Sequence, residues 1–293
     1  MLANNNEAII NKLAKNSVKT NKKQYAILFF TIILSAFMLF CVFTIGMTYL
    51  NSSRLQNTRL NGAEYDIVTM NGFTSEQLNT LQQNENIRSV GIESYAGFIQ
   101  STEYDKTVEI GLLWCDEVFW DNLMSPARTK LDGHYPQNKN ELMVTKDILK
   151  TCGNENLSVG DSLILTYENN TGVYTDEFVI SGIWDGYGDT SAGFVSKAFY
   201  DETGYDLKNN GILCIKLNCN YVFPTTIQSI EKSLDFSDRQ IFAPTGYIEN
   251  SFKLLLGICG LALVICLSAY LLIYNILYLS LIHISEPTRL QLI

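Results

Sequence analysis

The stretch that decides the architecture of this chain runs from Tyr25 to Leu50 and reads YAILFFTIILSAFMLFCVFTIGMTYL. It holds no charged residue, and the next charge along the chain is Arg54. At ~1.5 Å per residue, these 26 residues reach ~39 Å as a helix, enough to cross a hydrocarbon core of ~30 Å with some tilt. The stretch is too long for the apolar region of a signal peptide, and no small-x-small cleavage site closes it. We therefore predict a permanent transmembrane helix over residues 25–50.

A second apolar stretch of this kind lies near the other end of the chain. Residues 254–282 read LLLGICGLALVICLSAYLLIYNILYLSLI and also predict a transmembrane helix. Gly257 and Gly260 would allow another helix to approach closely there. Because neither span holds a charge, an ion or proton pathway through these two helices alone is disfavoured. Between them, residues 51–253 form a large polar segment.

The charges before the first span predict the orientation. Residues 1–24 hold one glutamate against five lysines, namely Lys12, Lys15, Lys19, Lys22 and Lys23. Lysines directly before a first span hold that end in the cytoplasm, so residues 51–253 are predicted to be extracytoplasmic. The leader also has apolar residues at helical spacing. It suits an amphipathic helix along the inner membrane surface or against a cytoplasmic partner, or simply a basic anchor.

The predicted outer segment is acidic. Residues 51–253 hold 28 Asp and Glu against 15 Lys and Arg, a net charge of −13. Phosphate repels such a surface, so nucleic acid is excluded as a partner. The charge could steer cationic ligands such as basic peptides, or it could only keep the domain soluble.

The chain has seven cysteines, and four of them fall in the outer segment: Cys115, Cys152, Cys214 and Cys219. The other three lie in the predicted spans, where cysteine packs as a small apolar residue. On a single strand, Cys214 and Cys219 would point to opposite faces, so a bond between them is not expected. The spacing leaves the disulfide pairing open and matches no structural zinc site.

The outer segment predicts an α+β domain. The predicted strands are residues 63–70, 87–100, 106–114, 162–167, 177–184 and 211–217. The predicted helices follow the capping residues Thr74, Thr145 and Ser196 or begin at Asp116 and Pro224. Thr74 with Gln77 forms a capping-box pattern. No helix breaker occurs in residues 51–60, so the first span is expected to continue as a stalk. The irregular order of strands and helices favours α+β over a sandwich or a solenoid.

No pattern of catalytic, cofactor-binding or metal-binding residues occurs. There is no phosphate loop and no His-Glu-x-x-His zinc motif. Only two histidines occur, His134 and His283, and neither lies beside a nucleophile turn. The run DGYGD at 185–189 does not have the spacing of a calcium loop. We therefore predict a non-catalytic protein without a cofactor.

Several features together resemble the FtsX/MacB-type permease subunit of ABC transporters. A lysine-rich leader, KLAKNSVKTNKKQYAI, runs directly into the first span, and an outer segment of about two hundred residues separates the two spans. Within that segment Gly133-x-x-Pro136 is followed by Asn140-Glu141, then LSVGD at 157–161 and FVISGI at 178–183. The resemblance covers roughly residues 12–280.

The resemblance implies a fold and a set of partners. The fold is two transmembrane helices flanking an extracytoplasmic domain of the MacB periplasmic-core type. The partners are a separate cytoplasmic ABC ATPase, a second permease in a homo- or heterodimer, and membrane lipid. Residues 51–60 and 247–253 would act as levers between the helices and the domain, for work on a peptide, lipid, lipoprotein or drug. Glu141 is expected to be structural, as a hydrogen-bonding partner in its loop. Gly133 and Gly160 suit turns with positive φ, and Pro136 would stiffen one of them.

The chain departs from this family at its end. Such permeases continue into a basic loop and further spans, whereas this sequence ends LIHISEPTRLQLI, which is typical of a translated sequencing adapter. We expect an N-terminal fragment with a non-native tail at 283–293. A two-span receptor with an extracytoplasmic sensor domain has the same outline and is the alternative. An anchored scaffold without energy coupling is a third possibility.

Overall fold

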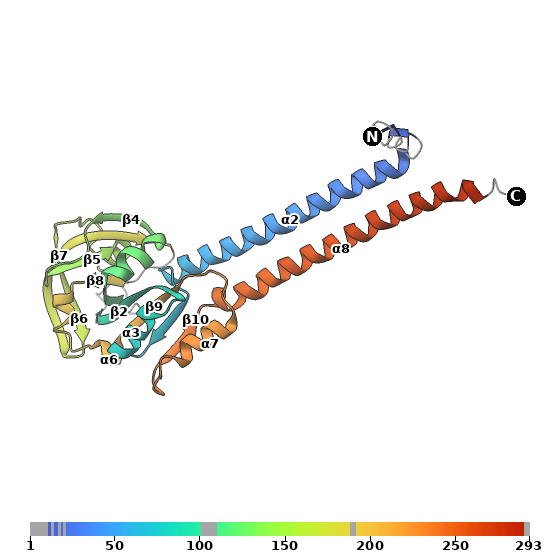
Figure 1. Ribbon diagram of the computed structural model, residues 1–293. Helices are drawn as coiled ribbons and strands as arrows, with labels where there is room; N and C mark the ends of the chain where they lie inside the picture. Colours follow the sequence, from blue (N-terminus) through green and yellow to red (C-terminus); the bar gives the residue numbers. More distant parts are fainter. Residues whose placement is uncertain are drawn as a thin grey trace, which may run out of the picture. The chain divides into compact units, whose positions relative to one another are not determined.

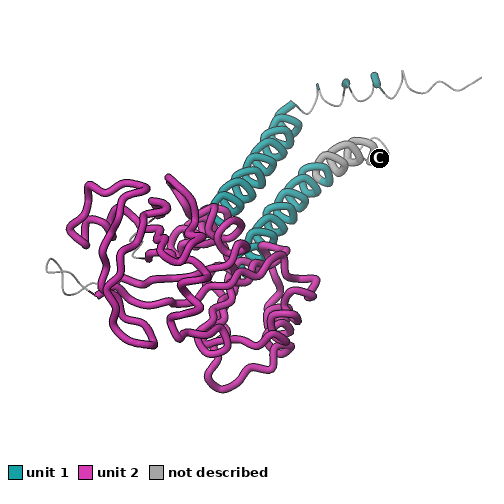
Figure 2. The backbone as a smooth tube through the Cα atoms, turned by 90° about the vertical axis from the view of Figure 1, so that its left-hand side faces the viewer, with its two compact units in different colours: residues 1–50, 253–293 teal, residues 51–252 magenta. Residues whose placement is uncertain are grey.

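The computed structural model describes residues 11–12, 15–16, 19, 22–100, 110–187 and 192–289. The chain forms two compact units, coloured separately in Figure 2. Residues 51–252 form a domain, and helix α2 up to Leu50 with helix α8 from Lys253 forms the other unit. Most of the expected amphipathic leader and the last four residues of the expected tail lie outside the described residues.

The helical unit is built from two long apolar helices. Helix α2 spans Lys22–Asn61 and helix α8 spans Gly246–Arg289, and by length and composition each could cross a membrane. Apolar side chains such as Phe30 and Ile45 are 68% and 69% exposed, which suits contact with lipid. Helix α2 does not stop at the end of the apolar stretch, because residues 51–61 continue it as the predicted stalk.

The two helices approach one another at Gly46. A Cβ atom on Gly46 would lie 2.6 Å from the Cδ1 atom of Ile258, so a larger residue would push α8 away. The same atom on Gly257 or Gly260 would meet nothing within 4 Å in the described part of the chain. The small residue at the contact between these two helices is therefore Gly46 of the first span.

The domain contains one mixed sheet of ten strands (Figure 1). Its order is β10-β1-β9-β2-β3-β8-β5-β7-β4, and β6 pairs with both β2 and β7. The strands are β1 Ile67–Met70, β2 Ile87–Ile99, β3 Ile110–Cys115, β4 Arg128–Gly133, β5 Glu141–Thr145, β6 Ser162–Asn169, β7 Gly172–Gly186, β8 Ala192–Val195, β9 Ile212–Leu217 and β10 Ile241–Pro244. Most pairs are antiparallel, but β3 with β8 and β5 with β7 are parallel. The mixed architecture confirms the predicted α+β class.

Six of these strands close into a ring. The pairings β2–β3, β3–β8, β8–β5, β5–β7, β7–β6 and β6–β2 return to their starting strand. A β-bulge between Tyr95 and Gly97 bends β2, so that its end reaches both β3 and β6. The ring encloses an apolar core that includes Leu112, Leu142 and Phe178, each at most 1% exposed. Helices α4 (Lys146–Thr151) and α5 (Lys197–Tyr200) contribute Ile148 and Phe199 to it.

Three of the four remaining strands form an open extension, β10-β1-β9, beside β2, and the fourth, β4, pairs with β7. Alternate residues of these strands face two different apolar layers. Ile67 and Ile215 pack on the side of helices α3 (Ser75–Gln83) and α7 (Pro224–Lys232). Val68 and Cys214 pack on the other side, with the short π-helical segment η1 (Val118–Leu123). This extension is the part of the domain that receives both long helices.

The local predictions agree with the structure where capping residues or turns defined them. The capping box of Thr74 and Gln77 opens α3, Thr145 caps α4, and Ser196 caps α5. Strand β1 begins at Ile67 instead of residue 63, and part of the strand predicted at 106–114 lies outside the described residues. Strands β4, β5, β8 and β10 were missed, because each has at most six residues and no clear alternation.

Candidate functional site

Both long helices join the domain at neighbouring strands. Helix α2 ends at Asn61, and β1 begins at Ile67. Strand β10 ends at Pro244, and α8 begins at Gly246. Strands β1 and β10 pair antiparallel, with Ile67 opposite Pro244. The end of the first helix and the start of the second are therefore linked through a single strand pair at one edge of the sheet.

Asp66 connects this strand pair to β9. Its carboxylate oxygen Oδ2 lies 3.2 Å from the Lys216 Nζ atom and accepts the Leu217 N–H at 2.9 Å. Its own N–H donates to the Ile215 carbonyl oxygen at 2.8 Å. Its carbonyl oxygen accepts the Thr245 N–H at 2.8 Å, one residue before α8. One residue therefore binds both the adjacent strand and the start of the second helix.

Lys216 makes a second ion pair, with Glu64 at 3.1 Å. The Lys216 and Asp66 side chains are 6% and 2% exposed, whereas Glu64 is 28% exposed. Burial raises the pKa of Asp66, and the Lys216 ammonium and the Leu217 N–H partly counter that effect. We call Glu64, Asp66, Lys216 and Thr245 the junction.

The buried ion pairs of the junction are suited to holding the surrounding strands in one arrangement. Removing two charges from water costs several kcal/mol per ion, and the pair repays this only with good geometry and further hydrogen bonds, so such pairs are weak evidence for stability. Their best-attested use is to define one arrangement of the chain. Here the contacts of Asp66 define one arrangement of β1, β9 and the start of α8.

Three further contacts hold the helix ends and the segment after α2 within the domain. The Arg59 guanidinium of α2 stacks over the Tyr187 ring at 4.0 Å, beyond the end of β7. The Phe252 ring of α8 lies 4.3 Å from the Phe223 ring, which precedes α7. The Glu64 N–H donates to the Leu123 carbonyl oxygen in η1. The stalk regions expected at 51–60 and 247–253 therefore contact several separate parts of the domain.

The residues that carried the family resemblance lie in turns. Gly133 and Gly160 have φ of 86° and 95°, as expected for turn glycines. Glu141 accepts the N–H groups of Gln137 and Asn138 and the side-chain amide of Asn138. Burial opposes ionisation of Glu141, but these hydrogen bonds outweigh it and lower its pKa. Its predicted role as a loop hydrogen-bonding partner is confirmed.

The other candidates considered in the sequence lie apart from the junction. His134 is an exposed loop residue whose ring nitrogen Nδ1 lies 3.0 Å from the Tyr135 carbonyl oxygen. Asp185 and Gly186 end β7, while Gly188 and Asp189 lie outside the described residues. The junction was not predicted, although one signal was present. A lysine inside the apolar strand run ILCIKL has to find a buried partner, and Asp66 directly precedes β1, one of the two strands that pair with it.

The sheet register restricts the cysteine pairing that the sequence left open. Cys115, Cys152 and Cys214 are buried, Cys219 is exposed, and all four are free thiols. Cys115 pairs with Glu93 of β2 from one side, and Cys214 pairs with Gly91 of β2 from the other. Two strand spacings are about 9.5 Å, beyond the reach of about 7 Å between the Cα atoms of a disulfide. A Cys115–Cys214 bond is therefore excluded.

No protein-family profile and no curated protein matches this chain. Among solved structures, the periplasmic region of MacB from Actinobacillus actinomycetemcomitans is similar over 66% of this chain and 95% of its own, with 13% identity and a TM-score of 0.43. The extracellular domain of the noncanonic ABC-type transporter YknZ from Gram-positive bacteria is similar over 61% and 98%, with 13% identity and a TM-score of 0.39. A domain assigned to a permease of Porphyromonas gingivalis is similar over 62% and 89%, with 9% identity and a TM-score of 0.38.

Proposed function

We propose that this chain is a permease subunit of an ABC transporter, in which movement of two membrane helices is passed to an extracytoplasmic domain. The observation that supports it best is the junction. The helices of membrane-spanning length continue into paired strands, and a buried Asp66–Lys216 ion pair connects those strands to β9. The order of the leader and of the motifs at 133–144, 157–161 and 178–183 supports the same proposal.

In the proposed mechanism, a separate cytoplasmic ATPase supplies the energy and this chain performs no chemical step. Residues 25–50 and 254–282 lie in the cell membrane, with the N-terminus in the cytoplasm and the domain outside. Binding and hydrolysis of ATP move the helices of a permease dimer. Because β1 and β10 pair directly, a displacement of either helix moves the same sheet edge. The moving domain acts on a peptide, lipid, lipoprotein or drug.

A two-span receptor is the second candidate. The observation that favours it is an open polar cavity in the domain, between α3, the short helix α6 (Leu207–Asn210) and the segment that joins α7 to β10. In a receptor, a ligand in this cavity would displace the helices, and a cytoplasmic signalling module would follow the second span. The two candidates therefore differ in what the gene encodes after codon 280.

The first experiment is to sequence the genomic locus through codon 280 with long reads. A frame that continues into a basic loop and further apolar spans, next to an ATPase gene with a phosphate loop, supports the permease. A frame that continues into a signalling module contradicts it. The two proteins are then co-expressed, and substrate transport and ATP binding are measured in the same membranes.

The lever is tested by inserting flexibility into the stalk. Leu55 and Gln56 of α2 are exposed, so the double variant L55G/Q56G removes no buried side chain. Each glycine costs about 1 kcal/mol of helix propensity and loosens the helix at that point. We expect loss of transport with ATP binding retained. The matched control L55A/Q56A keeps the helix and should transport normally; normal transport by the glycine variant would contradict the lever.

A further inference from the structure

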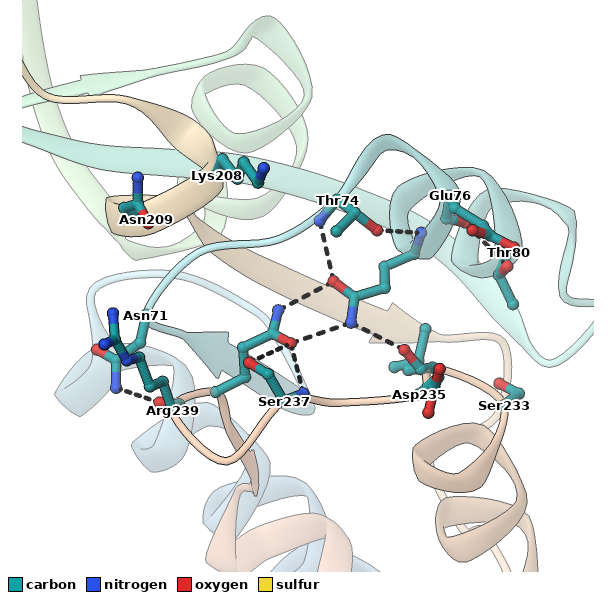
Figure 3. Close-up of a pocket in the computed structure, with 13 residues that line it drawn as sticks. Asn71, Thr74, Glu76, Thr80, Lys208, Asn209, Ser233, Asp235, Ser237 and Arg239 are labelled. Atoms are coloured by element: carbon teal, nitrogen blue, oxygen red, sulfur yellow. Dashed lines mark hydrogen bonds between the residues drawn. The ribbon is translucent and has the colours of Figure 1, made fainter.

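An open cavity lies on the α3 side of the sheet extension. It has a volume of about 460 Å³ (Figure 3). Its walls come from three separate segments: residues 71–80, which include the start of α3; Lys208 and Asn209 of α6; and residues 233–240, which join α7 to β10. It lies apart from the junction, and none of the four junction residues lines it.

Hydrogen bonds between the segments hold this cavity in shape. The side-chain amides of Gln77 and Gln240 bind each other in both directions, at 3.1 and 2.9 Å. Gln77 also donates to the Leu234 carbonyl oxygen, and Gln240 donates to that of Gly72. Asn71 donates to the carbonyl oxygen of Arg239. A cavity whose walls are already ordered loses little conformational entropy when a ligand binds.

The backbone is unusual at this cavity. In the described part of the chain, the non-glycine residues with left-handed φ are Asn71, at 67°, and Asp235, at 43°. Both of them line the cavity. Such conformations cost free energy and persist where the surrounding contacts impose them, and they are concentrated at binding sites.

The uncharged polar side chains of the cavity are already engaged. The Gln77 and Gln240 amides are satisfied by each other and by the backbone. The hydroxyl or amide groups of the others also form internal hydrogen bonds, namely those of Asn71, Thr74, Thr80, Asn209, Ser233 and Ser237. A neutral ligand such as a sugar, which is recognised through many hydrogen bonds, would find few groups free to bind it.

The charged side chains of the cavity differ from the uncharged ones. Lys208, Arg239, Glu76 and Asp235 are exposed, and none of the ion pairs found in the described chain includes them. Figure 3 shows Lys208 and Arg239 on the left of the lining residues and Glu76 and Asp235 on the right. The cations and the anions that line the cavity therefore lie on opposite sides of it.

We propose that this cavity binds a short zwitterionic peptide. The peptide carboxylate lies at Lys208 and Arg239, and its amino group lies at Glu76 and Asp235. A ligand with opposite charges at its two ends matches the separated charges, and a volume within the range of small-molecule sites accommodates more than a single amino acid. The uncharged side chains of the cavity already form hydrogen bonds with one another and with the backbone. Recognition therefore depends on the two charged termini of the peptide and tolerates different peptide side chains.

The test uses the full chain in lipid nanodiscs and trialanine as the probe, measured by isothermal titration calorimetry. We expect trialanine to bind, and acetylation of its amino group or amidation of its carboxylate to weaken binding by about tenfold each, the loss of one charged hydrogen bond. Equal binding of the free and the doubly blocked peptide overturns the proposal, as does the absence of trialanine binding. Binding of acetate alone, without a contribution from the peptide amino group, also overturns it.

Variants that remove charges from the cavity test which residues bind each terminus of the peptide. K208Q/R239Q should weaken trialanine about tenfold and leave the carboxyl-amidated peptide unchanged. E76Q/D235N should weaken trialanine and leave the acetylated peptide unchanged. Asparagine tolerates the left-handed φ of residue 235, so the second variant keeps the loop. Exposed charges elsewhere serve as matched controls, in K130Q/K146Q and E155Q/E177Q, and should bind as the parent does. Because the assay does not involve transport, its failure would leave the proposed permease function untouched.

Discussion

Lys216 Nζ lies 3.2 Å from Asp66 Oδ2, although the two residues are 150 positions apart in the chain. Both side chains are almost fully buried, and Asp66 also accepts the Leu217 N–H. The pair lies at the strand edge where both long helices join the domain. Within the domain, the pair therefore joins β9 to the segment that links α2 to β1.

Removing Lys216 alone should lower the free energy of unfolding more than removing both charges of the pair. K216M leaves the Asp66 carboxylate buried without its partner, and we expect a loss of about 3 kcal/mol in the free energy of unfolding. D66N/K216M should recover most of that loss, because an asparagine oxygen can still accept the Leu217 N–H. Urea unfolding followed by tryptophan fluorescence measures this, since all three tryptophans lie in the domain. Equal stability of the single and double variants would contradict the role given to the pair.

Gly72 should not tolerate a side chain. Its φ is 88°, and an added Cβ atom would lie 1.9 Å from the Lys208 carbonyl oxygen. We expect G72A to lose about 2 kcal/mol or more in the free energy of unfolding, through backbone strain and a clash with α6. Gly160 is the matched control, because its φ is 95° but an added Cβ would meet nothing within 4 Å. G160A should therefore lose only the strain, about 1 kcal/mol. Equal losses in the two variants would mean that α6 moves away freely.

Glu93 should make the domain less stable as pH rises. It lies on β2 between Cys115 and Ile212, and burial raises its pKa from 4.5 to about 7. The folded chain keeps this proton after the unfolded chain has lost it. The stabilisation is therefore complete below pH 4.5 and disappears as pH rises toward 7, by at most about 3 kcal/mol. The titratable groups that face Glu93 are Tyr65, Tyr135 and the thiols of Cys115 and Cys214.

The variant E93Q isolates this contribution, since other carboxyl groups titrate in both proteins. The difference in unfolding free energy between parent and variant should shift in favour of E93Q as pH rises from 4.5 to 7, in urea titrations at fixed ionic strength. A difference that stays constant over this range would show that Glu93 ionises as freely in the folded chain as in the unfolded chain.

Glu141 should show the opposite dependence. Its pKa is lowered, so its stabilisation is present at neutral pH and is lost as the carboxylate is protonated below its ordinary value of 4.5. We expect E141A to lose about 1 kcal/mol at pH 7, because two backbone N–H groups lose their acceptor. E141Q keeps one oxygen for those groups and should lose less. If the difference in unfolding free energy between parent and E141A stays the same in acid, the ionised carboxylate is not what stabilises this loop.

Local chemistry was enough to predict much of this chain. The uncharged length of residues 25–50 predicted a helix of spanning length, Thr74 and Gln77 predicted the start of α3, and Gly133 and Gly160 predicted their turns. Each of these signals is complete within a few neighbouring residues, so the rest of the fold is not needed to interpret it.

The junction and the cavity beside α3 depended instead on how distant segments meet. Asp66 becomes a partner of Lys216 only because β1 lies beside β9, and the cavity exists only because residues 71–80, α6 and residues 233–240 converge. Strand pairing is set by apolar burial over the whole sheet, which no single segment encodes. A buried charge likewise has a meaning only once its partner is in place, because burial without a partner is too costly to persist.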